Sequence, residues 1–175
     1  MTSLKNSGRL LKSFPIHPLV LIFSVVTENF FNFVVVFLLT MIPSMFLFDI
    51  SFYYIFLVPL AFVTLLVGVI TLTSLAAVIN VFYRDMKFIL SFLLSISFFL
   101  TPIFYDINLI PENLKWIISI NVFYYLIAPF RELLHRQDVP AFAWALLKVT
   151  LVDLGLMAWT YYYWNKKRNE LYAKL

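Results

Sequence analysis

Long apolar stretches separated by short polar segments dominate the sequence, and they predict helices that cross a membrane. A transmembrane helix needs about 20 mostly apolar residues, because the hydrocarbon core is about 30 Å thick and each helical residue adds about 1.5 Å. The stretches that meet this requirement predict spans at residues 18–42, 52–79, 88–105 and 142–164. The pattern therefore predicts an all-α integral membrane protein with about four transmembrane helices.

The segment 106–140, before the last predicted span, is expected to form a helical hairpin on the outer side. Its section Leu114–Phe130 is apolar, but Asn121 and Pro129 interrupt it. Broken backbone at membrane depth is tolerated where protein or a water-filled cavity covers it. We therefore interpret this segment as a re-entrant or interfacial hairpin rather than as a span.

The positions of Lys and Arg predict the orientation. Nine of the 13 basic residues lie in the segment 1–17, in the turn 80–87 and in the tail 165–175, and an even number of spans places these segments on one side. Basic loops remain cytoplasmic, so both termini are expected to be cytoplasmic. This bias also accounts for the net charge of +4, and no nucleic-acid partner is expected.

The composition excludes other classes of protein. The chain is 63% apolar and 13% charged, whereas a soluble domain carries about 25% charged residues. There is no cysteine, and three glycines and two histidines are too few for a phosphate-binding loop or a zinc site. No metal site and no bound cofactor are expected, and any ATP must be bound by another chain.

Two cytoplasmic segments carry charges with more than one interpretation. The segment 1–17 is amphipathic and basic, and it lies on lipid headgroups or fits into a groove of a partner. The turn at Arg84-Asp85 anchors the membrane surface, with Asp85 capping the next helix, or it docks a cytoplasmic partner. The sequence does not decide between these alternatives.

Polar residues inside the spans also allow two interpretations. Glu28 and Asn32 share one face deep in the first span. That face lines a translocation path or joins one helix to another through hydrogen bonds. Asp153, near the middle of the fourth span, allows the same choice, and contact with a Thr or Asn of another helix is favoured.

Aromatic residues gather in the predicted outer half of the protein. They form an interfacial belt or a wall on which sugar rings stack. The residues are Phe98, Phe99, Phe104, Tyr105, Trp116, Phe123, Tyr124 and Tyr125.

Several segments occur in an order that resembles the ABC-2 type permease subunits that export polysaccharides such as O-antigen, capsule and teichoic acid. The specific part is the turn Asn80-Val81-Phe82-Tyr83-Arg84-Asp85 followed by Thr101-Pro102-Ile103-Phe104-Tyr105. Val122 stands where that family usually has proline after Asn121. In this alignment the family's first two spans precede the chain, which suggests a truncated product, one piece of a split gene or a start at an internal Met.

The resemblance implies a single permease domain over residues 1–175 that pairs as a homodimer in the bacterial inner membrane. Two separate ABC ATPase subunits would bind ATP and Mg²⁺ and dock on the cytoplasmic side, and a lipid-linked glycan would pass through the channel. The chain itself would not be an enzyme. The residues implied in ATPase coupling are Lys5, Arg9, Lys12, Phe14, Pro15, Arg84 and Asp85. The candidates for the channel and hairpin are Glu28, Asn32, Pro102, Phe104, Tyr105, Trp116, Asn121 and Arg131.

Other functions compete with polysaccharide export. An ABC-2 exporter of drugs or small lipids belongs to the same class, and a truncated four-span protein without transport activity belongs to another. A membrane-embedded glycosyl-transfer enzyme is disfavoured, because Asp106, Glu112 and Asp138 form no recognisable catalytic arrangement.

Overall fold

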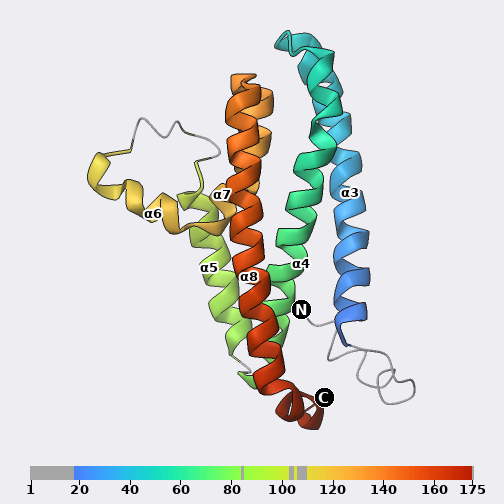
Figure 1. Cartoon of the computed structure of the whole chain (residues 1–175), viewed down its shortest axis with the longest axis vertical. Helices are drawn as coiled ribbons and strands as arrows, with labels where there is room; N and C mark the ends of the chain where they lie inside the picture. Colours follow the sequence, from blue (N-terminus) through green and yellow to red (C-terminus); the bar gives the residue numbers. More distant parts are fainter. Residues whose placement is uncertain (1–17, 84, 103–104, 106–109, 175) are drawn as a thin grey trace.

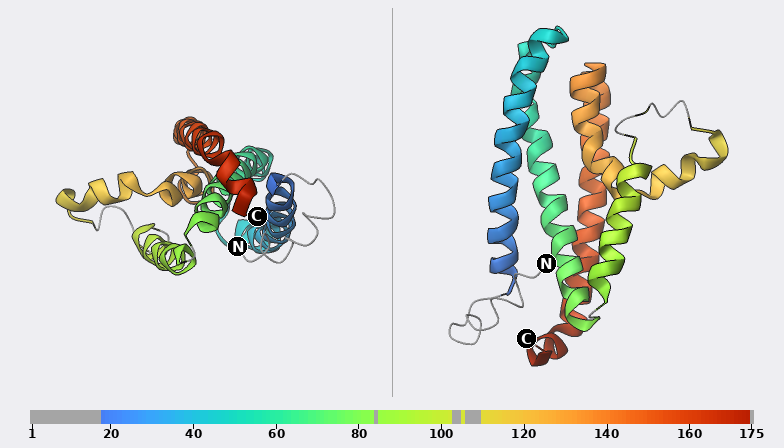
Figure 2. Two further views of the ribbon diagram at one scale, coloured as in Figure 1. Left: turned by 90° about the horizontal axis from the view of Figure 1, so that it is seen from below. Right: turned by 180° about the vertical axis from the view of Figure 1, so that it is seen from behind.

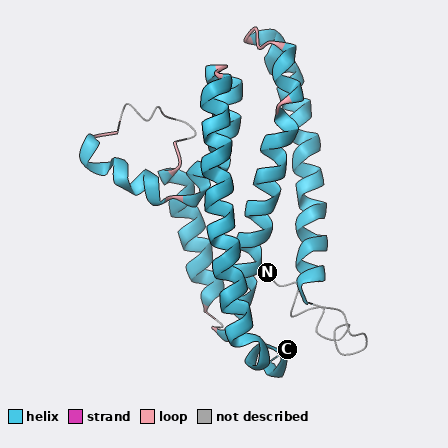
Figure 3. Ribbon diagram, viewed as in Figure 1, coloured by secondary structure: helices cyan, strands magenta, loops and turns pink. Residues whose placement is uncertain are grey.

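The computed structural model describes residues 18–83, 85–102, 105 and 110–174, and this part of the chain is helical without any strand (Figures 1 and 3). Its elements, in chain order, are α3 (Pro18–Leu47), η1 (Phe52–Phe56), α4 (Val58–Phe82), α5 (Met86–Leu100), η3 (Glu112–Leu114), α6 (Lys115–Ile120), α7 (Val122–Arg131), η4 (Glu132–Arg136) and α8 (Val139–Lys174).

Three helical stretches are long and apolar enough to cross a membrane. They are Val20–Leu47, Phe52–Phe82 and Val139–Lys167. Glu112–Ile120 and Val122–Arg136 add a fourth if this bent pair is counted as one span. The predicted all-α membrane protein is therefore confirmed.

Several helix ends differ from the sequence prediction. Helix α4 ends at Phe82 rather than at 79, and α8 covers Val139–Lys174 rather than 142–164. Two further ends lie close to a proline. Helix α3 continues through Pro43 to Leu47, beyond the expected end at residue 42, which membrane helices permit because neighbouring groups satisfy the freed backbone. The span expected over 88–105 is corrected to the 15-residue helix α5, which ends at Leu100. Thr101 is extended (φ −81°, ψ 121°), because a residue that precedes proline avoids the helical region.

Two short helices, α5 and α7, lie in different halves of the molecule, and we call them half-helices. Helix α5 is about 22 Å long at 1.5 Å per residue, too short to span the hydrocarbon core. Figures 1 and 2 show α5 in the half of the molecule nearer the end of α8, and α7 rising through the other half. Between them α6 points away from the bundle, and the arm that contains it meets the α7 arm at 95°. The break falls at Asn121, whereas Pro129 lies within α7.

The best-packed part of the molecule lies where α4, α7 and α8 meet. The buried residues of α4 include Ala61, Gly68, Thr71, Ser74 and Ala77. Small residues let helix backbones approach closely, which favours packing in a membrane. Phe37 of α3, Phe62 of α4 and Phe130 of α7 also pack edge to face, with ring centroids 5.1 to 5.4 Å apart.

Helix α3 is packed on one side only. Near its start, Ile22 and Val26 pack with Ala77 of α4. Near its end, Met41 and Met45 join a cluster that includes Val58 and Phe142. Much of the remaining surface of α3 is exposed, including Phe31 and Leu39, so this helix presents a broad apolar face.

Candidate functional site

Asn121 joins the two half-helices. Its side-chain Nδ2 donates a hydrogen bond to Thr101 Oγ1 (2.8 Å) and a longer one to the Ser97 carbonyl (3.3 Å) at the end of α5. Its Oδ1 accepts a hydrogen bond from the Phe123 amide (3.0 Å) at the start of α7. Helix ends leave backbone groups without partners inside the helix. Asn121 thus satisfies an amide of α7, whereas the Ser97 carbonyl already accepts from the Thr101 amide (2.9 Å) and hydroxyl (2.7 Å) and gains a third, longer contact.

The bent pair Glu112–Ile120 and Val122–Arg136 is called the hairpin below. A charged cluster lies at its C-terminal end, beside the start of α8. Glu132 is buried and accepts hydrogen bonds from Arg131 (3.1 Å) and Arg136 (3.2 Å). Arg131 also donates to the Tyr124 hydroxyl (3.3 Å), and its guanidinium lies 5.1 Å from the centroid of that ring. Each arginine donates to a different oxygen of the Glu132 carboxylate, and charge-assisted hydrogen bonds of this kind are stronger than neutral ones.

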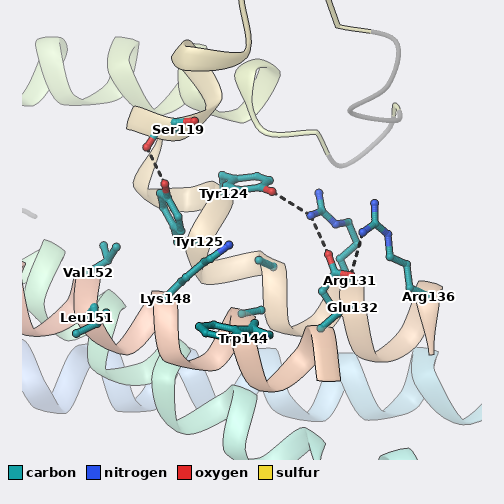
Figure 4. A pocket seen from close by; sticks show the side chains of 13 residues that line it. Ser119, Tyr124, Tyr125, Arg131, Glu132, Arg136, Trp144, Lys148, Leu151 and Val152 are labelled. Atoms are coloured by element: carbon teal, nitrogen blue, oxygen red, sulfur yellow. Dashed lines mark hydrogen bonds and ion pairs between the residues drawn. The ribbon is translucent and has the colours of Figure 1, made fainter. Parts of the chain in front are cut away.

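This cluster forms one wall of a pocket of about 790 Å³ between the hairpin and α8 (Figure 4). Trp144 and Lys148 enter from α8, one helical turn apart, while Tyr125 enters from α7. The Tyr125 hydroxyl donates to the Ser119 carbonyl (2.9 Å), which fixes the ring across the bend. The pocket therefore combines aromatic rings with three cationic side chains and one carboxylate.

The other aromatic candidates lie around the break at Asn121 between α6 and α7. Trp116 is exposed on α6 and lines an open hollow of about 330 Å³ with Asn121 and Phe123. The Tyr105 hydroxyl donates to the Phe99 carbonyl (3.0 Å), and Pro102 is buried. Phe104 lies outside the described residues. The structure thus brings Asn121, Pro102 and Trp116 to one region.

Glu28 and Asn32 are separate from that region, because they lie on α3 at the opposite flank of the molecule (Figure 1). Both are exposed, and they line an open hollow of about 630 Å³ on the surface of α3. No described helix covers this face. The described chain tests neither the translocation path nor the helix contact predicted for Glu28 and Asn32, and both stay predictions.

Asp153 is buried on α8 against α4. It is 3% exposed, and its Oδ1 has no hydrogen-bond partner among the described residues. It faces Gly68 of α4, where a Cβ atom in place of the glycine hydrogen would lie 2.8 Å from Oδ1 and would also overlap Leu126. The expected contact with a Thr or Asn is absent among the described contacts, and Gly68 is what makes room for the carboxyl group.

Most of the predicted coupling residues fall outside the described part of the chain. Lys5, Arg9, Lys12, Phe14, Pro15 and Arg84 are in this group. Asp85 occupies the N-cap position of α5, but its side chain makes no capping hydrogen bond. The coupling assignment therefore stays a prediction, and the capping interpretation of Asp85 holds for its position only.

Sequence reasoning missed several residues of the pocket and of the helix contact. Arg136, Trp144 and Lys148 were not candidates, and neither was Gly68. The i, i+4 spacing of Trp144 and Lys148 places them on one face of a helix, which is a signal that the sequence does contain. The proximity of that face to Arg136 depends on how the hairpin packs against α8, and no local pattern encodes it.

Comparison with known proteins identifies a family whose sequence model matches most of the chain. The sequence model described as "ABC-2 type transporter" matches residues 8–135. Two proteins of Klebsiella pneumoniae, each called "O-antigen export system permease protein RfbA", are also similar. One is 38% identical over 55 residues, covering 31% of this chain and 21% of that protein. The other is 29% identical over 76 residues, covering 43% of this chain and 29% of that protein. The matched stretches therefore span less than a third of either relative.

Proposed function

The chain belongs to the ABC-2 type transporter family, and on that premise we propose that it is a permease subunit of an ATP-driven polysaccharide exporter. Its substrate is a lipid-linked polysaccharide or glycolipid that crosses the cytoplasmic membrane. The observation that carries the substrate class is the similarity to two O-antigen export permeases. Aromatic and cationic residues at the broken hairpin support it, since aromatic faces suit sugar rings and arginines suit anionic groups.

In the proposed assembly, other subunits bind ATP and complete the channel. A separate ABC ATPase binds ATP and Mg²⁺, and a second copy of the permease completes the channel. The chain is treated as one permease domain with both termini cytoplasmic, as the distribution of basic residues favours. In that orientation the turn at Arg84-Asp85 faces the ATPase, and the pocket beside α8 lies in the outer half of the membrane.

The proposed coupling route begins at the cytoplasmic side. The basic segment with Lys5, Arg9 and Lys12, together with the Arg84-Asp85 turn, contacts the ATPase. Because α5 begins at Met86, a displacement of this turn moves α5 directly. Asn121 then transmits the displacement to the start of α7, since it hydrogen-bonds both half-helices.

The test is an export assay in cells that carry the complete exporter. Arg84→Ala and Asp85→Ala are each expected to abolish surface polysaccharide and to reduce recovery of the ATPase in a mild-detergent pull-down. Glu112→Ala is the control, because Glu112 is an exposed acidic residue near the hairpin, far along the chain from that turn. Normal export in both turn variants, at normal membrane levels, would rule out the coupling role. A pull-down that never recovers an ATPase would contradict the exporter assignment itself.

A further inference from the structure

Helices α4 and α8 make the most extensive contact between elements of the described chain, and a carboxyl group lies in the middle of it. Asp153 is midway along the stretch Val139–Lys167, about 21 Å from either end at 1.5 Å per residue. It faces Gly68, near the middle of the stretch Phe52–Phe82. Asp153 is 3% exposed, and its Oδ1 has no hydrogen-bond partner among the described residues. The carboxyl group is therefore enclosed at the depth where a charge is most costly.

The hydroxyl groups on the facing side of α4 are already engaged. Thr64 and Thr71 lie one turn on either side of Gly68, on the same face of the helix. Thr64 donates to the Ala61 carbonyl (3.0 Å) and Thr71 to the Val67 carbonyl (2.9 Å). A hydroxyl has a single hydrogen to donate, so neither threonine is left to stabilise a negative charge on α8.

No described cation pairs with Asp153 either. Helix α4 contains no ionisable side chain. The ionisable residues of α7 and η4, which also pack against α8, are Tyr124, Tyr125, Arg131, Glu132, His135 and Arg136. Both arginines pair with Glu132, and the hydroxyls of the two tyrosines contact Arg131 and the Ser119 carbonyl. On α8 itself the closest charged residue along the chain is Lys148, and the described ion pairs do not join it to Asp153.

A carboxylic acid suits this position, whereas a carboxylate does not. Burial of an isolated carboxylate in an apolar interior is so unfavourable that such a group takes up a proton instead. A protonated carboxyl group carries one O–H donor, which can bond within its own helix. Asn29 of α3 shows this geometry for a side chain of the same shape, because its Nδ2 donates to the Val25 carbonyl one turn earlier (2.7 Å). One proton thus removes the charge and supplies a donor.

We propose that Asp153 binds one proton and that α4, α7 and α8 pack closely only while this proton is bound. A Cβ atom at Gly68 would lie 2.8 Å from Oδ1 of Asp153 and would overlap Leu126 of α7. An ionised carboxylate requires water or a cation beside it, and this contact has no room even for one methyl group. Release of the proton therefore separates α8 from α4 and frees Leu126, so that the packing of the hairpin responds to pH. This inference does not depend on the exporter assignment.

The first measurement is the infrared spectrum of the full chain in detergent near neutral pH, with aspartate isotope-labelled at its carboxyl carbon. The C=O stretch of a carboxylic acid is separate from that of a carboxylate, and the label distinguishes aspartate from glutamate. We expect an aspartic acid band in the wild type and none in Asp153→Asn. Asp49→Asn is the matched control and should keep the band, because Asp49 is an exposed aspartate after α3. Its left-handed backbone (φ 50°) also accepts asparagine.

The second measurement is stability as a function of pH, from unfolding in mixed micelles with increasing dodecyl sulfate. Unfolding exposes Asp153 to solvent, where an aspartic acid loses its proton above about pH 4. The folded chain then holds one proton more than the unfolded chain, so wild-type stability falls as the pH rises. The unfolding constant of the wild type, relative to that of Asp153→Asn, should increase about tenfold per pH unit until the folded chain also releases the proton. Asp49→Asn should follow the wild type.

Three results would overturn the proposal. A wild type without an aspartic acid band would mean that Asp153 is ionised while it is packed. A band that persists in Asp153→Asn would belong to another aspartate. Equal pH dependence of the wild type and Asp153→Asn would mean that packing does not require the proton. If Asp153→Asn does not fold, the labelled wild type is followed as the pH rises, and tertiary structure that outlasts the acid band would overturn the proposal. None of these measurements involves an ATPase or export, so failure here is distinguishable from failure of the proposed function.

Discussion

Helices α4 and α3 differ in whether their polar side chains are buried or exposed. Helix α4 buries Thr71 and Ser74 against its neighbours, and each hydroxyl donates to a carbonyl one turn earlier in the same helix, at 2.9 and 2.7 Å. On α3, Glu28 and Asn32 are exposed. A hydroxyl that bonds to its own helix can be buried without another partner, whereas burial of a carboxyl group without a partner is costly. Asp153 is such a group, because it is buried and its Oδ1 has no hydrogen-bond partner among the described residues. The comparison therefore describes how α4 and α3 differ, and Asp153 of α8 is an exception to it.

Glu132 extends this comparison to a charged group that is buried because its partners come with it. Glu132→Ala should lower the free energy of unfolding by about 3 kcal/mol, because it leaves two guanidinium groups without a shared carboxylate. The value lies at the low end of the range for buried pairs, since Arg136 is half exposed. Unfolding in mixed micelles with increasing dodecyl sulfate measures it.

The control for Glu132 is Glu112→Ala, which removes an exposed ion pair with Lys115. Exposed pairs contribute less than about 1 kcal/mol. If both variants lose the same stability, burial of Glu132 has no energetic consequence, and the contrast between packed and exposed groups fails.

Gly68→Ala should lower the stability by an intermediate amount. The added methyl group would overlap the Leu126 side chain and approach Oδ1 of Asp153 within 2.8 Å. Overpacking of this kind destabilises by about 1–3 kcal/mol, seen as a lower thermal unfolding temperature in detergent. Gly155→Ala is the matched control, because nothing lies within 4 Å of its Cβ position. A loss at Gly155 as large as that at Gly68 would disprove close approach as the cause.

Glu28→Gln and Asn32→Ala should have the smallest effects on the isolated chain. Both side chains are exposed, and substitutions at such positions usually change stability by within about 0.5 kcal/mol. The same detergent unfolding assay measures them. A loss above about 1 kcal/mol, outside that range, would mean that this face of α3 is covered in the isolated chain, and α3 would then resemble α4.

The sequence predicted the long helices well because their length is a local property. Residues 18–42 and 52–79 contain few polar side chains, and a bilayer permits only helices or closed barrels. The ends of the helices were harder to predict. Pro43 suggested an end at residue 42, but α3 continues past it to Leu47. Pro102, by contrast, follows the end of α5 at Leu100, and Thr101 before it is extended.

The candidate site was predictable only in part. Asn121 is visible in the sequence as an interruption, and it is the residue at the break of the hairpin. Gly68 and Asp153 lie far apart in the chain, and their contact depends on the rotation of α4 against α8. The pocket that Lys148 shares with Arg136 exists only after the hairpin has packed. Spacing along one helix is readable from sequence, but the register between helices is not.

The meeting of the end of α5 with the start of α7 has an electrical consequence. Peptide dipoles give the C-terminal end of α5 about half a negative charge and the N-terminal end of α7 about half a positive charge. A continuous helix would place such charges only in the headgroup regions, whereas here two opposite poles meet inside the bundle, where Asn121 bridges them. Because opposite poles attract, the end of α5 and the start of α7 stabilise each other's position across Asn121.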